Sequence, residues 1–465
     1  MKSLATNHND PNAKLGWVER LGYGSGQFGM NLINAILGSF LTIYFTNVTA
    51  LNIAIISSII AVSKLFDGVS DIIMGNIVDK TNSKLGKARV WLLRMCIPFG
   101  VSTLLLFFVP QHFPTMVQYI YVFIFYNLVN AVFFTSMFVP YASMTYLISQ
   151  NSYERGLLGN ISQIFSTLAN VTINAVFLRF LAFFGGGEEG MYTQRAFTGT
   201  MLLVCGVMLL ASLICVFTTK ERVVNTVSKP KENEAQSKDK VKTLDAVKAL
   251  LTNKYWVILT FCMFTVFFVV VMFSVAAIYY TQYVLEDVNL FPLMSNSVSI
   301  AQFAIMFTTP FLMKKFGRHK VYTVGIGVVL VGFVGFVFVG GNMPLMVFCN
   351  ALKGIGMGAA GGMSLGMVAD TIDYGWKKTG IEVAGMGNAG ISAAQKLGLG
   401  LGTAVMGWVL NAGGFDGQAA VQSASAITAI NFCYTWIPII LMGITFILML
   451  FFYRLEGRVE ENKTA

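Results

Sequence analysis

The chain has 465 residues, of which 55% are hydrophobic and only 12% are charged. Soluble domains usually carry about 25% charged residues, so this composition excludes a protein whose whole surface faces water. The formal net charge of +10 would suit an anionic partner such as nucleic acid. Its distribution along the chain indicates a different origin.

The N-terminal residues 1–17 are polar and contain no apolar core followed by a small-residue cleavage site, so we expect no cleaved signal peptide. After them, apolar runs long enough for a membrane helix of about 20 residues recur along the chain. The runs are too long for barrel strands and lack their alternation. We predict an all-α integral membrane protein with twelve transmembrane helices. The expected spans are 22–47, 52–78, 91–110, 116–148, 156–184, 196–218, 255–285, 292–313, 321–340, 343–374, 383–411 and 427–453.

Basic residues alternate between the loops in a regular way. If the N-terminus is cytoplasmic, most of the 32 Lys and Arg residues fall in cytoplasmic segments, and Arg195 alone falls in an outer loop. This asymmetry follows the positive-inside rule, so it explains the net charge without nucleic acid and places both termini in the cytoplasm. Five basic residues lie near or within the spans: Lys64, Arg94, Arg179, Lys353 and Lys396.

The longest polar stretch, residues 219–254, follows the sixth span and is rich in Lys, Glu, Asn and Ser. It is typical of a flexible cytoplasmic linker, with a short amphipathic helix expected at 243–251. The chain then divides into an N-terminal six-helix half, residues 1–218, and a C-terminal six-helix half, residues 255–465.

Similar basic turns follow the second span, at 80–89, and the eighth span, at 314–318. These places are equivalent in the two halves. Two six-helix halves joined by a cytoplasmic linker are the arrangement of the major facilitator fold.

The second span contains three ionisable residues, each of which costs about 2.5–3.5 kcal/mol at the membrane centre on insertion scales. Lys64, Asp67 and Asp71 are spaced by three and four residues, so they share one helical face. Two acids one turn apart repel each other, and a bound cation would relieve that repulsion.

Ser70 and, from the fourth span, Thr135 add neutral oxygens of the kind that hard cations prefer. We therefore predict a cation site formed by Asp67, Ser70, Asp71 and Thr135, in which Asp67 and Asp71 bind the metal if the cation is sodium. In the alternative, Lys64 and Asp67 form a structural ion pair and Asp71 faces the cytoplasmic vestibule.

Amide side chains are frequent in the predicted spans. Each amide both donates and accepts hydrogen bonds, which suits a neutral solute rich in hydroxyl groups. The residues predicted to bind substrate are Asn31, Asn34, Gln163, Gln395 and Lys396. The alternative is that amides pair between helices as packing contacts, which we expect for Asn170 and Asn174.

Several other function classes lack support in the sequence. Residues 356–361 and 385–390 match GxGxxG, but neither pattern follows a strand, so no dinucleotide site is predicted. No phosphate-binding GK[ST] loop is present, and the three histidines lie in or near loops without a nucleophile. The six cysteines lie in apolar runs without a CxxC pair, as expected for buried apolar side chains. We predict that the protein is not an enzyme.

Three spaced blocks resemble the glycoside–pentoside–hexuronide:cation symporters. FDGVSDIIMG at 66–75 resembles that family's WDxxxDPxMG signature, and the likeness continues into GKARVWLL at 86–93. ADTIDYG at 369–375, followed by KTG at 378–380, resembles ADxxDYGEWKTG, and QKLG at 395–398 fits QKxG. With the span pattern, the resemblance covers nearly the whole chain.

The resemblance implies a major facilitator fold and sugar uptake coupled to sodium, proton or lithium. It assigns the acids of the cation site to Asp67 and Asp71, with Ser70 at a position that is often Asn and Thr135 supplying a hydroxyl.

The sugar site departs from the melibiose permease branch of that family. There, acids stand at the positions of Asn31 and Phe138 and an arginine at the position of Gln163, so that only Lys396 is retained from the charged set. The amide at position 31 is closer to the glucuronide and xyloside branches, and Lys396 would pair with a uronate carboxylate or donate to a neutral hydroxyl.

The resemblance also implies a charged gating network at the cytoplasmic side. Its expected members are Asp79, Lys80, Arg89, Asp370 and Asp373. Trp376 replaces a usual glutamate, and Glu382 with Ala384 replaces an Arg-x-Glu pattern, so the network must be rewired there.

From these observations we predict a secondary transporter of the cell (inner) membrane that imports a sugar or glycoside by symport with sodium or proton, through alternating access. The expected partners are the small-molecule sugar, the coupling cation (Na⁺ or H⁺) and the lipid bilayer, with no other cofactor, no nucleic acid and no obligate protein partner. Two alternatives stay open: a cation-independent facilitator or exchanger, and a transporter-like sugar sensor.

Overall fold

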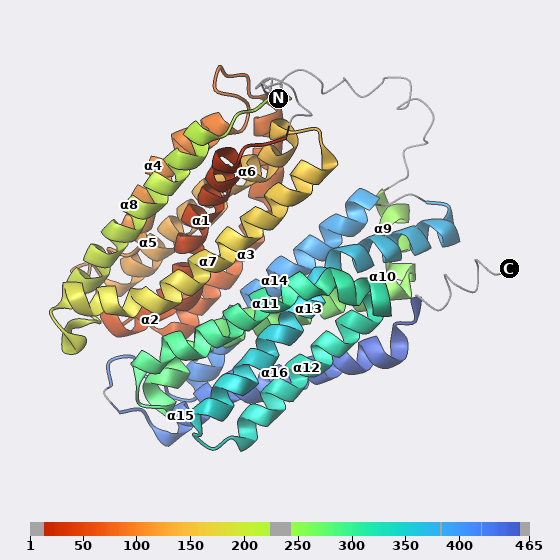
Figure 1. Ribbon diagram of the computed structural model, residues 1–465. Coiled ribbons are helices and arrows are strands. Elements are labelled where there is room, and N and C mark those ends of the chain that lie inside the picture. Colours follow the sequence, from red (N-terminus) through yellow and green to blue (C-terminus); the bar gives the residue numbers. More distant parts are fainter. Residues whose placement is uncertain (1–13, 224–242, 382–383, 420, 456–465) are drawn as a thin grey trace, which may run out of the picture. The chain divides into compact units, whose positions relative to one another are not determined.

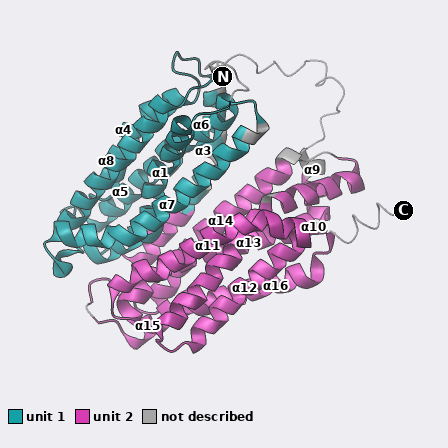
Figure 2. Ribbon diagram, viewed as in Figure 1, with its two compact units in different colours: residues 1–51, 62–237 teal, residues 52–61, 238–465 magenta. Residues whose placement is uncertain are grey.

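The computed structural model describes residues 14–223, 243–381, 384–419 and 421–455. Within these ranges the chain forms helices and their connections, grouped into two compact units (Figures 1 and 2). Unit 1 comprises residues 1–51 and 62–237, and unit 2 comprises residues 52–61 and 238–465. The first turns of one long helix, α3, therefore group with unit 2 and the rest of that helix with unit 1.

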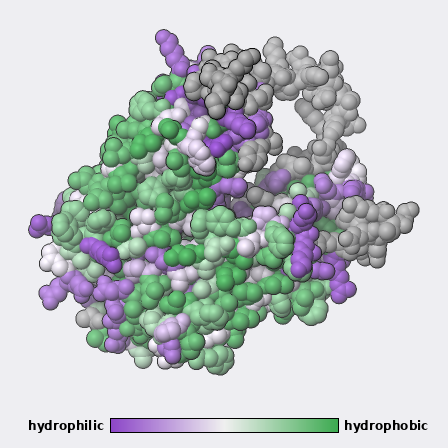
Figure 3. All heavy atoms as spheres, in the orientation of Figure 1, coloured by the Kyte–Doolittle hydropathy of each residue, from purple (hydrophilic) through white to green (hydrophobic). Residues whose placement is uncertain are grey.

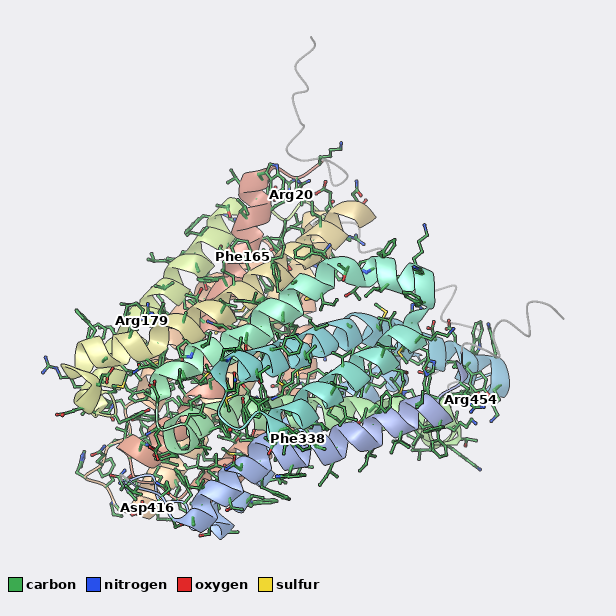
Figure 4. All side chains as sticks on the ribbon, turned by 60° about the horizontal axis from the view of Figure 1, so that its bottom comes forward. Arg20, Phe165, Arg179, Phe338, Asp416 and Arg454 are labelled. Carbon is green, nitrogen blue, oxygen red and sulfur yellow. The ribbon has the colours of Figure 1, made fainter. Side chains whose placement is uncertain are left out.

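Unit 1 is a bundle in which α1 packs against α7 and α8, while α4 packs against α6 and α8. Its helices are α1 (Trp17–Ser39), α2 (Leu41–Ile43), η1 (Tyr44–Val48), α3 (Ile53–Lys80), α4 (Arg89–Leu106), α5 (Thr115–Asn127), η2 (Leu128–Phe134), α6 (Thr135–Ile148), α7 (Ser152–Gly185), η3 (Glu188–Gly190) and α8 (Gln194–Thr218). Arg20 at the start of α1 and Arg179 toward the far end of α7 mark opposite ends of this bundle (Figure 4).

Unit 2 is a second bundle, in which α13 packs against α11 and α12, and α10 packs against α14. Its helices are α9 (Thr243–Thr252), α10 (Lys254–Tyr279), η4 (Tyr280–Val284), η5 (Val288–Leu290), α11 (Phe291–Phe316), α12 (Arg318–Phe338), α13 (Met343–Thr379), α14 (Ala384–Ala412), α15 (Ala424–Asn431), η6 (Phe432–Trp436), α16 (Ile437–Ile447) and η7 (Leu448–Phe452). Asp416 and Arg454 mark its two ends (Figure 4). The short helix expected at 243–251 is present as α9.

The described residues contain ten helices that are long and apolar enough to cross a membrane, or eleven when α1 and the segment Leu41–Val48, which meet at a 52° bend, count as one span. The remaining predicted span is α14, which has 29 residues. A helix needs about 20 residues to cross a bilayer, so α14 is long enough. Gln395, Lys396 and many glycines lower its mean hydropathy. Hydrophobic side chains cover most of the visible flanks of both bundles, and hydrophilic ones gather mainly at the helix ends (Figure 3).

Glycines in unit 2 permit close helix packing. A Cβ atom at Gly356 would collide with the backbone of α12, and one at Gly358 would collide with the backbone of α11. Gly398 and Gly402 of α14 approach the backbone of α10 in the same way. The GxGxxG match at 356–361 is therefore a packing surface inside a helix, as its sequence context indicates.

The structure changes one expectation about the linker. Residues 219–223 were expected to belong to a flexible segment, but Thr219 and Glu221 are buried. The backbone N–H groups of Arg222 and Val223 donate to Leu147 O at 2.9 Å. The guanidinium of Arg222 binds both carboxylate oxygens of Glu19, at 2.7 and 2.8 Å. The beginning of the predicted linker is thus a packed part of unit 1.

Candidate functional site

The face of α3 in unit 1 brings the predicted acids together. Lys64, Asp67 and Asp71 are all half-buried. The ammonium of Lys64 donates to Asp67 Oδ2 at 3.0 Å. The ion pair between Lys64 and Asp67, which is one part of the predicted alternative, is therefore present, and it engages one of the two Asp67 oxygens.

The other oxygen, Asp67 Oδ1, is buried and accepts no hydrogen bond. Leaving a charged, buried acceptor without a donor is costly, since the lost hydration is not replaced. Lys64 alone therefore does not satisfy this carboxylate, and the unmatched oxygen marks a position where a further positive charge would be stabilised.

Thr135 and Ser70 complete the cluster. The hydroxyl of Thr135, at the start of α6, donates to Asp71 Oδ1 at 3.3 Å. The hydroxyl of Ser70 lies 3.5 Å from Thr135 Oγ1 and donates to Asp67 O at 3.0 Å. The four residues predicted for a cation site thus lie in one group, and all of their polar side-chain atoms are oxygens.

The π-helical segment η2 directly precedes Thr135 and positions it. A π-helical turn inserts one extra residue per turn, and such turns are frequent at functional sites. Asn130 of this segment offers its carbonyl to the Thr135 hydroxyl at 3.3 Å. The irregular turn therefore sets the height at which Thr135 meets α3.

Two neighbours of the cluster were missed by sequence reasoning. The Lys64 ammonium lies 5.9 Å from the centre of the Tyr126 ring. Ser63 accepts a hydrogen bond from the Asn127 amide at 2.8 Å. These contacts fix α5 against α3 beside the ion pair. The aromatic and hydroxyl residues of this apolar sequence carry no local signal that singles out Tyr126 and Ser63.

The predicted substrate residues divide between the units. In unit 1, Asn31 is buried and its amide donates to Gln27 O of the same helix, whereas Asn34 and Gln163 are exposed. In unit 2, Gln395 and Lys396 of α14 are half-buried, and the Gln395 amide lies 3.9 Å from Met263 Sδ.

The predicted cytoplasmic network also separates into local contacts. Arg318 binds both oxygens of Asp370 in unit 2, at 2.8 and 2.9 Å. Asp373 and Lys80 are exposed, and the Asp79 side chain and Glu382 lie outside the described part of the structure. In the described residues, Lys80, Arg89, Asp370 and Asp373 form no hydrogen bond or ion pair with one another, so the network as predicted is not seen there.

Arg89 belongs to a different assembly in unit 1. Its guanidinium donates to Val216 O at 2.9 Å, and its backbone N–H donates to Glu221. The Glu221 carboxylate accepts in all from three successive backbone N–H groups, those of Lys87, Ala88 and Arg89, at 2.7, 3.1 and 2.8 Å. We name these three amides and Glu221 the amide cradle.

Gly86 makes room for the amide cradle. It has a φ of +110°, and a Cβ atom there would collide with the Glu221 carboxylate. The Gly-Lys-Ala-Arg motif thus shapes the loop between α3 and α4 to receive an acid from the end of α8. Sequence reasoning found the motif but not Glu221.

The bundles of long apolar helices and the intramembrane acid cluster define a multi-pass membrane transporter. A model of the family described as MFS/sugar transport protein matches residues 22–457. The chain belongs to this family, which confirms the predicted major facilitator fold and makes the protein a transporter rather than an enzyme.

Relatives of known name support the resemblance found in the sequence. The chain is 29% identical to an isoprimeverose transporter of Lactiplantibacillus pentosus over 440 residues, covering 94% of this chain and 88% of that protein. It is 24% identical to a glucuronide carrier protein homolog of Escherichia coli K12 over 461 residues, covering 97% and 95%. A crystal structure of a D-xylose-proton symporter has a TM-score of 0.63 at 14% identity and covers 94% of this chain and 97% of its own. That similarity shows a shared fold.

Proposed function

We propose that this protein imports a sugar or glycoside across the cell inner membrane by symport with sodium or a proton. The observation that carries the proposal is the group formed by Asp67, Asp71, Ser70 and Thr135, with Asp67 Oδ1 buried and without a donor. Its oxygens suit a hard monovalent cation, and Asp67 Oδ1 equally suits a proton.

The charges of the cluster suggest how coupling arises. With both acids ionised and Lys64 protonated, two negative charges and one positive charge leave a net charge of −1. One monovalent cation therefore brings the cluster to neutrality. An uncompensated charge is costly inside a membrane protein, so the loaded carrier changes conformation more readily than the empty one. One cation then moves inward for each cycle.

The relatives and the polar residues support a proposal for the substrate class. The relatives include an isoprimeverose transporter and a glucuronide carrier protein homolog. The amides of Asn31, Asn34, Gln163 and Gln395 suit hydroxyl groups, and Lys396 suits a uronate. We propose a xyloside or a glucuronide as the substrate, with no cofactor besides the cation. The excess of basic residues in alternate loops supports cytoplasmic termini.

The direct test is uptake into proteoliposomes with a panel of neutral xylosides, glucuronides and simple hexoses. Each solute is offered with an inward sodium gradient, with an inward proton gradient, and with neither. We expect accumulation above the external concentration for at least one solute under one of the two gradients. Equal uptake with and without both gradients would replace the proposal with a facilitator, and saturable binding without any uptake would replace it with a sensor.

A cation-independent exchanger is the second candidate, and the Lys64–Asp67 ion pair is the observation that favours it. A tethered ammonium beside Asp67 could replace the cation permanently. Counterflow that is fast and unaffected by sodium and pH would favour the exchanger over the symporter.

Lys64→Met separates these two candidates. If Lys64 only neutralises part of the negative charge of a working cation site, its removal makes the site more negative by one charge. We then expect the apparent affinity for the coupling cation to rise at least tenfold. A unit charge about 4 Å away contributes about 4 kcal/mol at an effective dielectric of 20. The measurement is the cation dependence of initial uptake rates. Lys315→Met, at an exposed lysine in unit 2, is the control. If Lys64 replaces the cation, the variant would instead acquire a cation requirement that the parent protein lacks.

A further inference from the structure

Lys353 is a fully buried lysine that the proposed transport mechanism does not use. It lies on α13, ten residues after Met343, which is about 15 Å along the helix axis at 1.5 Å per residue. Its side chain has no solvent exposure. In the described part of unit 2, no carboxylate forms an ion pair with its ammonium. A lysine this deep in a membrane helix therefore needs another source of stabilisation.

Aromatic rings surround the Lys353 ammonium. Its Nζ lies 4.1 Å from the ring centre of Phe336, 4.4 Å from that of Phe333, 4.7 Å from that of Phe273 and 5.1 Å from that of Tyr434. The rings come from three different elements, α10, α12 and η6. Each distance falls within the range in which a ring face attracts a cation, and this attraction is strongest where water is excluded. We call these four rings the aromatic cage.

Asn350 completes the cage with one polar contact. The Lys353 ammonium donates to Asn350 Oδ1 at 2.9 Å. The amide nitrogen of Asn350 donates to Met294 O of α11 at 3.3 Å, which fixes the side chain with its oxygen toward Lys353. The contacts of Nζ thus include four ring faces and one amide acceptor. Such an environment is built for a positive charge, whereas an apolar side chain would have sufficed for packing.

We propose that the aromatic cage and Asn350 form an ammonium-binding site, and that Lys353 fills this site from within the chain in its charged form. The cage is similar in chemistry to the aromatic cages that bind quaternary ammonium ligands. It stabilises unit 2 by joining four of its helices around one charge.

The cage also reaches two irregular segments of unit 2. The Tyr434 ring stacks on Tyr280 with ring centres 4.3 Å apart, and on Phe273 with centres 4.8 Å apart. Tyr434 lies in the π-helical segment η6 and Tyr280 in η4. Of the titratable groups on these elements, Tyr434 is part of the cage, Tyr280 stacks on Tyr434, and Cys349 of α13 interacts electrostatically with the ammonium. The charge on Lys353 holds both π-helical segments against α12 and α13.

The test removes the Lys353 ammonium by mutation and supplies a small amine from solution in its place. Lys353→Ala removes a side-chain fragment that matches n-propylammonium. We expect this variant to unfold several degrees lower than the parent protein in a detergent melting experiment. Millimolar n-propylammonium should restore most of the shift, and 1-propanol should not. The control is Lys315→Ala, at an exposed lysine beside Phe316, which should neither melt earlier nor respond to the amine.

Lys353→Met and Lys353→Arg provide a second measurement if the alanine variant does not fold. Methionine keeps most of the volume without the charge, so we expect it to melt several degrees lower, while arginine, which stays charged, should melt closer to the parent. Phe336→Leu should lower the melting temperature more in the parent than in Lys353→Met, because only the parent has a charge for the ring to bind. Equal melting of Lys353→Met and the parent, or equal rescue by amine and alcohol, would show that the site is packing alone.

Discussion

Asp67→Asn and Asp71→Asn are each expected to abolish accumulation of the sugar while leaving the protein folded. A cation of charge one moving inward through 100 mV releases about 2.3 kcal/mol. At about 1.4 kcal/mol per tenfold, this supports an accumulation of about fifty-fold for a neutral solute. When one of the two carboxylates is replaced by an amide, the cluster is neutral before a cation binds, so the accumulation ratio should fall to about one. The measurement is steady-state uptake into proteoliposomes at a fixed potential.

Asp416→Asn provides the matched control, since this carboxylate lies in the loop after α14 at one end of unit 2 (Figure 4). It should accumulate substrate like the parent protein. Exchange of internal for external sugar should survive in the Asp67 and Asp71 variants if the substrate site is intact. Full accumulation in both variants would remove the carboxylates from the coupling mechanism.

Glu221→Ala is expected to have the largest effect on stability among single changes in unit 1. The carboxylate in the amide cradle accepts three hydrogen bonds, and a hydrogen bond to a charged group contributes about 1.5–3 kcal/mol. Water would replace part of the hydrogen bonding that the three backbone N–H groups lose, so we expect the free energy of unfolding to fall by about 3 kcal/mol. Thermal or denaturant unfolding of purified protein in detergent measures the change.

Glu221→Gln keeps one acceptor oxygen in the amide cradle and should fall between the parent protein and Glu221→Ala. Glu189→Ala, at an exposed residue of η3, should unfold like the parent. If Glu221→Ala is as stable as Glu189→Ala, the cradle is an incidental contact and residues 219–223 are held by Arg222 and Glu19 instead.

The sequence was sufficient to predict the face of α3. A spacing of three and four residues places Lys64, Asp67 and Asp71 together in any helix, and the rarity of charges in apolar spans draws attention to them. Thr135 was predicted from its hydroxyl oxygen, and the family resemblance assigned it the same role, but no local rule states which turn of another helix meets Asp71. The structure supplies the reason, which is the π-helical turn of η2.

Other features could not be predicted from local patterns. Glu221 lies about 130 residues from the amides it binds, and nothing near it in the sequence marks it as different from the other acids of the polar stretch. The aromatic cage around Lys353 draws its rings from three elements, none of which is distinctive among so many Phe and Tyr residues. Long-range contacts of this kind depend on tertiary packing alone.

The six cysteines of this protein, all free and all buried, make it a convenient starting point for chemical labelling. Water-soluble maleimides should react slowly with the parent protein, so a single cysteine introduced at an exposed position would be modified selectively without first removing native thiols. Introduced one at a time along α1 and α14, such cysteines would report, by their rate of modification with and without sugar, which side of the membrane each position faces at each step of transport.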